Sequence, residues 1–279
     1  MSALVLGATG TTGAKVLRGS RAKGIAAFGA ARKGSDRRFD WSDVSTHDAA
    51  LAGVDRMYVL PPPGDAAPEE RTIPFLERAR AAGVRRFVLL SSSAIEEGDP
   101  GLGRIDAWLR SHVPQWTILR PSWFMENFFD PSRQHQATIA AENRIVSATG
   151  DGKVGFIASE DIAAVAVAAL TDGPQRTAPV LTGPAALSYG DVAAILSRTL
   201  GHPVRHDSVT VEELARRFTT LGIPEAYAIF LAGLDEAIAR GAEAKVTDEV
   251  QRWTGRAPIA FAQLAEARAG KTRAEGERR

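Results

Sequence analysis

The first residues with the capacity for chemistry are three glycines near the N-terminus. Gly7, Gly10 and Gly13 stand in Gly-Ala-Thr-Gly-Thr-Thr-Gly, directly after an apolar run that we expect to form a strand. In a dinucleotide-binding loop such glycines permit a tight turn, close approach of the backbone to a pyrophosphate, and packing of the next helix. Free N–H groups and the positive end of the helix dipole then face the phosphates. A structural turn is the alternative interpretation. The predicted cofactor contacts in this loop are Gly7, Thr9, Gly10, Thr11, Thr12 and Gly13.

Two cations, Arg32 and Lys33, end the second expected strand. About 20 residues past the glycines, an NAD site carries an acidic residue for the ribose hydroxyls, whereas an NADP site tends to carry Arg for the 2′-phosphate. The first carboxylate that follows is Asp36. The pair therefore predicts NADP(H) as the cofactor, and a solvated pair of surface cations is the alternative.

Further cofactor contacts are expected where three strands end, because ligands of open parallel sheets bind beyond the carboxyl ends of the strands. Each of these residues could equally serve a turn. The candidates are Leu60, Pro61, Pro62, Ser91, Ser92 and Pro121, and we add Asp40 and Trp41 as residues that could flank the adenine.

The elements that must position these residues alternate regularly between strand and helix. Near-continuous apolar strands alternating with helices predict an α/β fold, a Rossmann-type doubly wound parallel sheet. The expected strands are Ala3–Leu6, Ile25–Ala31, Val54–Leu60, Val84–Leu90 and Trp116–Leu119, and the helices between or beside them include Glu69–Ala82 and Leu102–His112.

The regular alternation of strands and helices ends after Pro121, where an aromatic segment leads into longer helical stretches. Ser159 and Ser188 are predicted to cap two of these helices. We therefore expect residues 1–150 to form the NADP(H)-binding domain, with 151–182 partly returning to the sheet. Residues 183–267 would form a smaller, mostly helical C-terminal lobe, and 268–279 a disordered tail.

Composition limits the remaining classes of function. The 279 residues are 44% hydrophobic and 24% charged, with 34 Lys and Arg against 33 Asp and Glu, which argues against a disordered chain or a strongly basic nucleic-acid binder. The absence of Cys excludes disulfides, thiolate metal sites and cysteine nucleophiles, and the five His show no metal-ligand spacing. We expect a cytoplasmic monomer or homodimer that acts on a small molecule, with no metal, membrane or nucleic-acid partner.

Several motifs together resemble one known family. The sequences GATGTTG, FDWSD, VDRMYVLPPP, GVRRFVLLSSSA, WTILRPSWFMENF and VTDEVQRWTGRAP are similar to the NmrA-like, atypical short-chain dehydrogenase/reductases. More narrowly, they resemble bacterial relatives of ergot-alkaloid reductases of the festuclavine-dehydrogenase type. The resemblance extends to about Ala267. It implies a Rossmann domain that carries NADP(H) and a substrate pocket under the C-terminal lobe.

The chain departs from the wider superfamily at the catalytic dyad. Typical short-chain dehydrogenases use Tyr-x-x-x-Lys, in which the phenol protonates a carbonyl oxygen. Here Tyr58, Tyr189 and Tyr227 are followed four residues later by Pro62, Ala193 and Leu231, so the dyad is absent. The catalytic residues are therefore unknown from the sequence. The candidates are Ser92 and Ser93, which have no obvious activating base, and Asp106, for which stabilisation of a helix start is the alternative role.

The missing dyad constrains the reaction. Hydride attack on a ketone creates an alkoxide that needs a proton donor or an oxyanion stabiliser, whereas a protonated imine already carries its proton. An aromatic pocket could stabilise such a cation. The aromatic segment after the expected strand Trp116–Leu119 could line such a pocket, or it could instead be packed in the hydrophobic core. The predicted substrate-pocket residues are Trp123, Phe124, Met125, Asn127 and Phe128.

The sequence thus predicts an NADPH-dependent reductase of a small, largely apolar electrophile. An imine or iminium is the favoured substrate, and a quinone or activated alkene comes next. A non-catalytic NADP(H)-binding redox sensor is one alternative. A cyclase that retains the cofactor site as a scaffold and catalyses no redox step is another.

Overall fold

The central strands of the molecule are apolar and mostly buried, as is typical of a parallel sheet that helices cover on both faces. In the computed structural model, which describes residues 1–276 and side chains as far as residue 270, the strand order is β3-β2-β1-β4-β5-β6-β9. In register, Leu4 lies beside Phe28 on one neighbouring strand and Met57 on the other. This is the doubly wound parallel sheet that the sequence predicts. The strands are β1 (Ser2–Leu6), β2 (Ala26–Ala31), β3 (Arg37–Arg38), β4 (Arg56–Val59), β5 (Arg86–Leu90), β6 (Gln115–Pro121) and β9 (Val180–Leu181).

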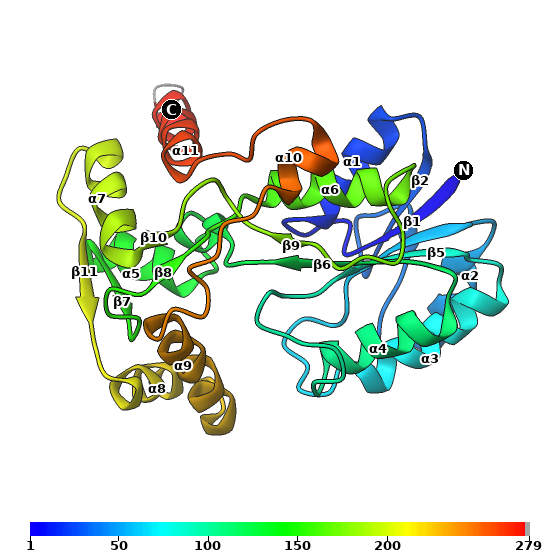
Figure 1. The fold of residues 1–279 in the computed structure, drawn as a ribbon, viewed down its shortest axis with the longest axis horizontal. Coiled ribbons are helices and arrows are strands. Elements are labelled where there is room, and N and C mark those ends of the chain that lie inside the picture. The colour runs from blue at the N-terminus through cyan, green and yellow to red at the C-terminus, as the bar shows by residue number, and fades with distance from the viewer. Residues whose placement is uncertain (277–279) are drawn as a thin grey trace. The chain divides into compact units, whose positions relative to one another are not determined.

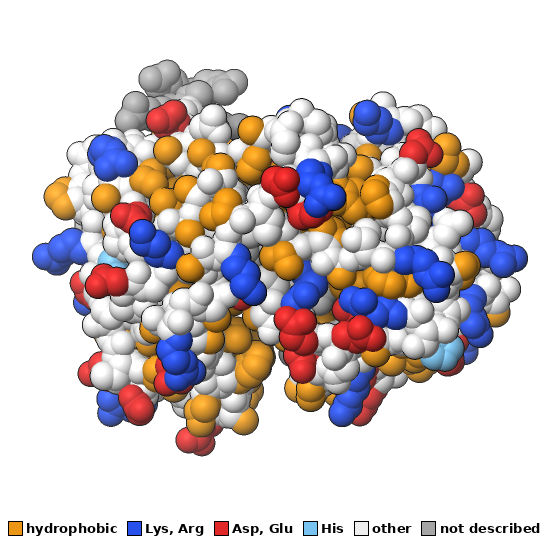
Figure 2. All heavy atoms as spheres, viewed as in Figure 1, with side chains coloured by type: hydrophobic (Ala, Val, Ile, Leu, Met, Phe, Trp, Pro, Cys, Tyr) orange, Lys and Arg blue, Asp and Glu red, His pale blue; other side chains and the backbone are white. Residues whose placement is uncertain are grey.

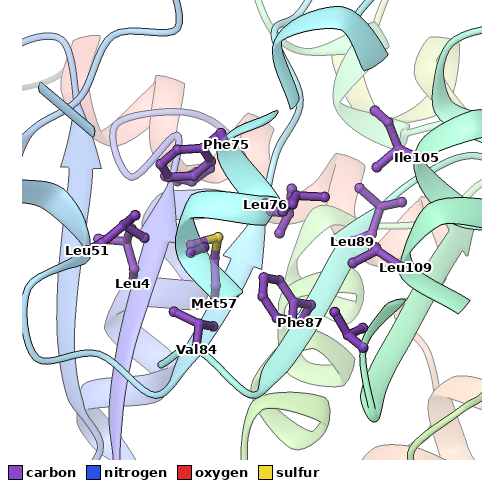
Figure 3. Packing of buried hydrophobic residues seen from close by; sticks show 14 of the residues in the cluster. Leu4, Leu51, Met57, Phe75, Leu76, Val84, Phe87, Leu89, Ile105 and Leu109 are labelled. Carbon is purple, nitrogen blue, oxygen red and sulfur yellow. The ribbon is translucent and has the colours of Figure 1, made fainter. Parts of the chain in front are cut away.

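Helices cover the two faces of this sheet (Figure 1). On one face Phe75 and Leu76 lie among Leu4, Met57 and Phe87 of the strands, as Figure 3 shows. On the other face α1 and α6 lie side by side, and α10 packs on α6. The first group contains the 3-10 helix η1 (Val44–Thr46), α2 (His47–Leu51), α3 (Glu69–Ala81) and α4 (Leu102–His112), and the second contains α1 (Gly13–Ala22), α6 (Ser159–Leu170) and α10 (Glu249–Thr254).

The chain divides into two units, and the sheet belongs to the first. Unit 1 consists of Met1–Pro121, Ser159–Leu181 and Glu249–Arg256, whereas unit 2 consists of Ser122–Ala158, Thr182–Asp248 and the chain from Ala257 onward.

Unit 2 is mostly helical and has its own core. Phe128, Phe156, Tyr189 and Phe261 are buried there against one another. Capping boxes begin two of its helices, at Ser188 with Asp191 and at Thr210 with Glu213, so the predicted cap at Ser188 is confirmed. Its helices are η2 (Met125–Phe128), α5 (Gln134–Glu142), α7 (Tyr189–Leu200), α8 (Val211–Thr220), α9 (Glu225–Ala239) and α11 (Phe261–Gly276), and its strand pairs are β7 (Arg144–Ser147) with β11 (Arg205–Ser208) and β8 (Lys153–Val154) with β10 (Leu187–Ser188).

The α8–α9 hairpin exposes an apolar surface. Leu221, Tyr227, Ile229 and Phe230 are all exposed, and Figure 2 shows hydrophobic side chains at the surface over these two helices. The inner positions of the hairpin are small or apolar and pack against Ala148.

The observed division differs from the predicted domains. Residues 122–150 belong to unit 2 rather than to the cofactor-binding domain, and 249–256 belong to unit 1 rather than to the C-terminal lobe. Residues 159–181 also belong to unit 1, as expected for part of 151–182. The reason is packing, because α6 and α10 cover the sheet and β9 pairs with β6. Residues 268–276 of the predicted disordered tail continue helix α11, and 277–279 lie outside the described residues. Within residues 1–276, every helix is too short or too polar to span a membrane.

Candidate functional site

The glycine loop connects the end of β1 to the start of α1. Gly7 has φ of 64°, a conformation that side chains disfavour, and its carbonyl oxygen accepts from the Gly10 N–H at 2.9 Å. A Cβ at Gly13 would lie 2.2 Å from that same oxygen, whereas one at Gly10 would lie 3.3 Å away. Helix α1 begins at Gly13, and the backbone N–H groups of Thr11, Thr12 and Gly13 form no hydrogen bond with another described residue. The loop therefore offers unpaired donors and a helix N-terminus to a phosphate.

A cavity of about 930 Å³ opens beside this loop, at the carboxyl ends of β1, β2 and β4. Its volume falls within the range of about 300–1,000 Å³ that is usual for small-molecule sites. It brings together nine of the predicted cofactor residues. They are Gly7, Thr9, Gly10, Arg32, Lys33, Asp40, Trp41, Leu60 and Pro62.

Three cations line the cavity, one more than the sequence predicted. Arg38 joins Arg32 and Lys33, and its guanidinium lies 3.3 Å from the Asp43 carboxylate at an exposed position. The neighbouring Arg37 serves the fold instead, because it donates to the Ala50 carbonyl oxygen at 2.6 Å and lies over the Phe28 ring. Burial lowers the pKa of Arg37. The sequence does contain a sign of this third cation, namely the Arg37-Arg38 doublet. Successive side chains of a strand point to opposite sides, so one of the two arginines must face the cavity.

The first carboxylate after β2 does not line the cavity. Asp36 accepts from the Gly29 N–H at 2.6 Å and pairs with Arg21 of α1 at 2.5 Å. Asp40, the carboxylate that does line it, accepts from the Ser42 N–H at 2.9 Å. Three cations therefore face one carboxylate, which suits an anionic ligand group.

Aromatic rings form one wall of this cavity. Trp41 packs edge-on against Phe39 and Phe75, with ring centroids 4.9 Å and 5.4 Å apart. Phe39 is itself a lining residue that the sequence analysis did not select. A donor-rich loop, three cations and an aromatic wall together fit a dinucleotide with an additional phosphate.

The remaining predicted cofactor residues lie outside the lining of this cavity, and their roles stay predictions. Ser91, Ser92 and Pro121 nevertheless follow or end β5 and β6, which are the next strands of the sheet after β4. The set outside the lining is Thr11, Thr12, Gly13, Pro61, Ser91, Ser92 and Pro121.

Asp106, a candidate catalytic residue, is held inside the fold by an ion pair. Its buried carboxylate pairs with Arg110 at 2.5 Å, four residues along α4, and this bond helps to raise the pKa of Arg110. Arg110 in turn lies over the Trp116 ring. Asp106 therefore helps to hold Arg110 against Trp116, and this structural role accounts for its burial.

Ser92 and Ser93 lie in the turn after β5. The Ser92 hydroxyl accepts from the Ala94 N–H at 3.3 Å, and the Ser93 carbonyl oxygen accepts from Arg120 at 3.2 Å. Among the described residues, the Ser92 hydroxyl has no His or carboxylate partner that would activate it, so a nucleophilic role of Ser92 gains no support here.

The three tyrosines occupy very different surroundings. Tyr58 is fully buried in β4, and its hydroxyl has no partner among the described residues. Tyr189 is buried in unit 2, whereas Tyr227 is exposed on α9. Burial raises the pKa of both Tyr58 and Tyr189. The phenol of Tyr58, which is the one tyrosine in unit 1, is thus closed off by the core of the sheet.

The predicted substrate-pocket residues separate into two groups. Trp123, Phe124 and Asn127 are half-buried and stay candidates. Met125 and Phe128 belong to the core of unit 2, where the Phe128 ring stacks on His135 at 5.0 Å, so core packing accounts for these two.

Comparison with known proteins matches residues 7–173 to a family described as NAD(P)H-binding. The chain belongs to this NAD(P)H-binding family. The matched segment runs from the glycine loop through α6, so it contains the whole cavity described above.

Relatives and a solved structure agree with this assignment. The chain is 40% identical to the oxidoreductase YesF of Bacillus subtilis, which is itself uncharacterized, over 95% of this chain and 94% of that protein. It is 38% identical to festuclavine dehydrogenase of Aspergillus fumigatus over 82% of each chain. The fold matches triphenylmethane reductase of Citrobacter sp., solved with NADP(H), with a TM-score of 0.80 at 22% identity over 96% of this chain and 100% of that one.

The resemblance to NmrA-like atypical short-chain reductases is therefore confirmed. The chain is an NAD(P)H-dependent oxidoreductase.

Proposed function

We propose that this chain is an NADPH-dependent reductase of small, largely apolar imines or iminium ions. The observation that carries the proposal is the chemistry of the cofactor cavity and its surroundings in unit 1. The cavity has three cations for a phosphate, and the single tyrosine of the unit is buried away from solvent.

The glycine loop and the cations would bind different phosphates of the cofactor. The N–H groups at the start of α1 would bind the pyrophosphate, as helix N-termini do. Arg32, Lys33 and Arg38 would hold the 2′-phosphate, with the two guanidinium groups suited to paired hydrogen bonds. Trp41 would cover the adenine.

We choose an imine because the sequence contains no Tyr-x-x-x-Lys dyad that could protonate an alkoxide. When bound, the reduced nicotinamide supplies a hydride. A protonated imine brings its own proton, so addition of hydride to its carbon gives a neutral amine and requires no acid from the protein. Tyr58 is buried and Asp106 is held by Arg110, so neither is available to protonate an alkoxide.

The half-buried aromatic residues after β6 would recognise the substrate. Trp123 and Phe124 offer ring faces that attract a cation, and the amide of Asn127 offers a hydrogen-bonding group. The relation to a dehydrogenase named for festuclavine, an ergot alkaloid, supports an amine–imine pair as the class of product and substrate.

The test is the rate of NADPH oxidation with matched panels of cyclic imines, quinones and ketones. The proposal expects turnover of the cyclic imines, and a rate that follows the protonated fraction of each imine. Turnover confined to ketones would contradict it. Equal affinity for oxidised and reduced cofactor without any turnover would favour the redox sensor, and conversion of a substrate without NADPH oxidation would favour the cyclase.

A further inference from the structure

A second cavity, of about 560 Å³, lies wholly within unit 2. Four helices contribute to its walls, namely η2, α5, α7 and α11. None of the residues that line the cofactor cavity takes part in it.

The base of this cavity is apolar. Phe128, Ile139, Leu196 and Ala265 line it and are buried in the core of unit 2. Leu200 also lines it, yet this large apolar side chain is 39% exposed. An apolar ligand body would cover Leu200 and remove its surface from water.

The rim carries polar groups, and three of them have no partner in the part of the chain that the structure describes. The side chains of Gln136, Asn143 and His202 form no hydrogen bond or ion pair with the described residues. Arg268 of α11 supplies a positive charge, although this charge also acts on Asp130. No Asp or Glu is present among the described lining residues. The rim therefore favours a ligand head that is anionic and accepts hydrogen bonds.

We propose that this cavity binds a small organic carboxylate with an aromatic or alkyl body. The body would rest against Phe128, Ile139 and Leu196. The carboxylate would accept from Arg268 and from the side chains of Asn143 or His202. This cavity shares no lining residue with the cofactor cavity, so the test of this proposal does not depend on the proposed function.

The experiment is isothermal titration of the full chain with naphthoate, carried out with and without NADPH. We expect one molecule of naphthoate per chain. Methyl naphthoate and naphthylmethylamine should bind about tenfold more weakly or worse, because they lack the negative charge. No binding of naphthoate, or equal binding of all three compounds, would overturn the proposal.

Two variants and a matched control locate the site. Arg268→Gln should weaken naphthoate binding about tenfold to a hundredfold, as expected for loss of a charge-assisted bond. Ala140→Trp should abolish binding, because Ala140 is an exposed lining residue from which an indole ring would fill the cavity. Arg198→Gln, which removes an exposed charge of α7 outside the lining, should leave binding unchanged. Unaltered binding in both site variants would contradict the assignment even if the protein binds naphthoate.

Discussion

At the scale of residues, we expect three cations of the cofactor cavity to decide which cofactor this chain accepts. Arg32 and Lys33 could be selected from the sequence because of their place after a predicted strand, and both line the cavity. Arg38 could not be separated from Arg37 in the same way, since their different roles depend on which side of β3 each side chain takes. Asp36, the first carboxylate after Arg32 and Lys33, accepts from the Gly29 N–H and pairs with Arg21.

Replacement of Arg32 and Lys33 by Gln should weaken NADPH binding far more than NADH binding. Each lost bond to a phosphate costs about 1.5–3 kcal/mol, so we expect a loss of about a hundredfold or more for NADPH. Arg38→Gln should produce a smaller loss of the same kind, because Arg38 is also paired with Asp43. Titration by cofactor fluorescence would measure all of these affinities.

Arg18→Gln is the matched control for that titration, because Arg18 is an exposed cation of α1 that does not line the cofactor cavity. It should change neither affinity. An equal loss of NADPH and NADH binding in the double variant would show that the cations do not hold a 2′-phosphate.

His135 should make the free energy of unfolding depend on pH. Its ring is buried against Phe128, and burial together with the nearby His206 lowers its pKa to about 4. Between pH 6.5 and 4 the unfolded chain binds a proton that the folded chain does not, so stability falls as the pH falls. From about pH 7 to about pH 5, the wild type should lose about 2 kcal/mol more than His135→Gln in urea unfolding.

Asp235 should act in the opposite direction. Burial raises its pKa to about 6, while its carboxylate accepts from the Ala148 N–H at 2.9 Å. Here the folded chain binds the proton more tightly, so stability rises as the pH falls toward 4. Relative to Asp235→Asn, which keeps an oxygen acceptor, the wild type should gain about 1 kcal/mol between about pH 7 and about pH 5. These assignments predict that the difference in free energy of unfolding between the wild type and the variant changes with pH in opposite directions for His135→Gln and Asp235→Asn. A change in the same direction for both would contradict them.

At the scale of elements, local sequence patterns predicted the helices and the apolar strands, but they did not predict the strands that form only by pairing with distant segments. The helix predicted at Leu102–His112 has those bounds in the structure, and the predicted strands coincide with β1, β2, β4, β5 and β6 to within about two residues at most ends. In contrast, β3 has two residues and β11 reads Arg-His-Asp-Ser, so neither shows an apolar pattern. Their pairing depends on partners that lie elsewhere in the sequence, such as Ile145 opposite His206.

Alanine substitutions at Gly13 and Gly10 should destabilise the protein to different extents, because the two positions differ in the space available for a methyl group. Gly13→Ala places a methyl group 2.2 Å from the Gly7 carbonyl oxygen, so we expect a destabilisation of about 1–3 kcal/mol and loss of NADPH binding. Gly10→Ala meets the same atom at 3.3 Å and should retain more stability. Thermal unfolding and cofactor titration of both variants would check this order, and the reverse order would show that the loop geometry is wrong.

At the scale of the whole molecule, the two units are interleaved along the chain. The sequence suggested a boundary near residue 150, because the Gly150-Asp151-Gly152 turn interrupts the helical pattern. The structure places Ser159–Leu181 in unit 1, where we expect part of 151–182 to rejoin the sheet, but it also adds Glu249–Arg256 from the expected C-terminal lobe. Local sequence did not reveal the place of Glu249–Arg256, since the fit of α10 against α6 is a property of two packed surfaces.

A fragment of residues 1–150 should therefore fail to fold stably. It lacks α6, whose Ile162, Val165 and Ala166 are fully buried, and it lacks β9 beside β6. The sheet would be left with one face largely uncovered, and such exposed apolar surface favours aggregation. Circular dichroism and amide chemical-shift dispersion, with the full chain as control, would measure this. A well-dispersed spectrum and cooperative unfolding of the fragment would contradict the division into these units.

The source of the substrate's proton distinguishes the proposed reduction of an imine from reduction of a ketone. The most direct test compares the rates of NADPH oxidation with one cyclic imine and the cyclic ketone of the same skeleton, across a range of pH. We predict turnover of the imine, with a rate that falls as the imine loses its proton, and no measurable turnover of the ketone. Reduction of the ketone at a comparable rate would contradict the account, because it would require a proton donor that the buried Tyr58 and the paired Asp106 do not provide.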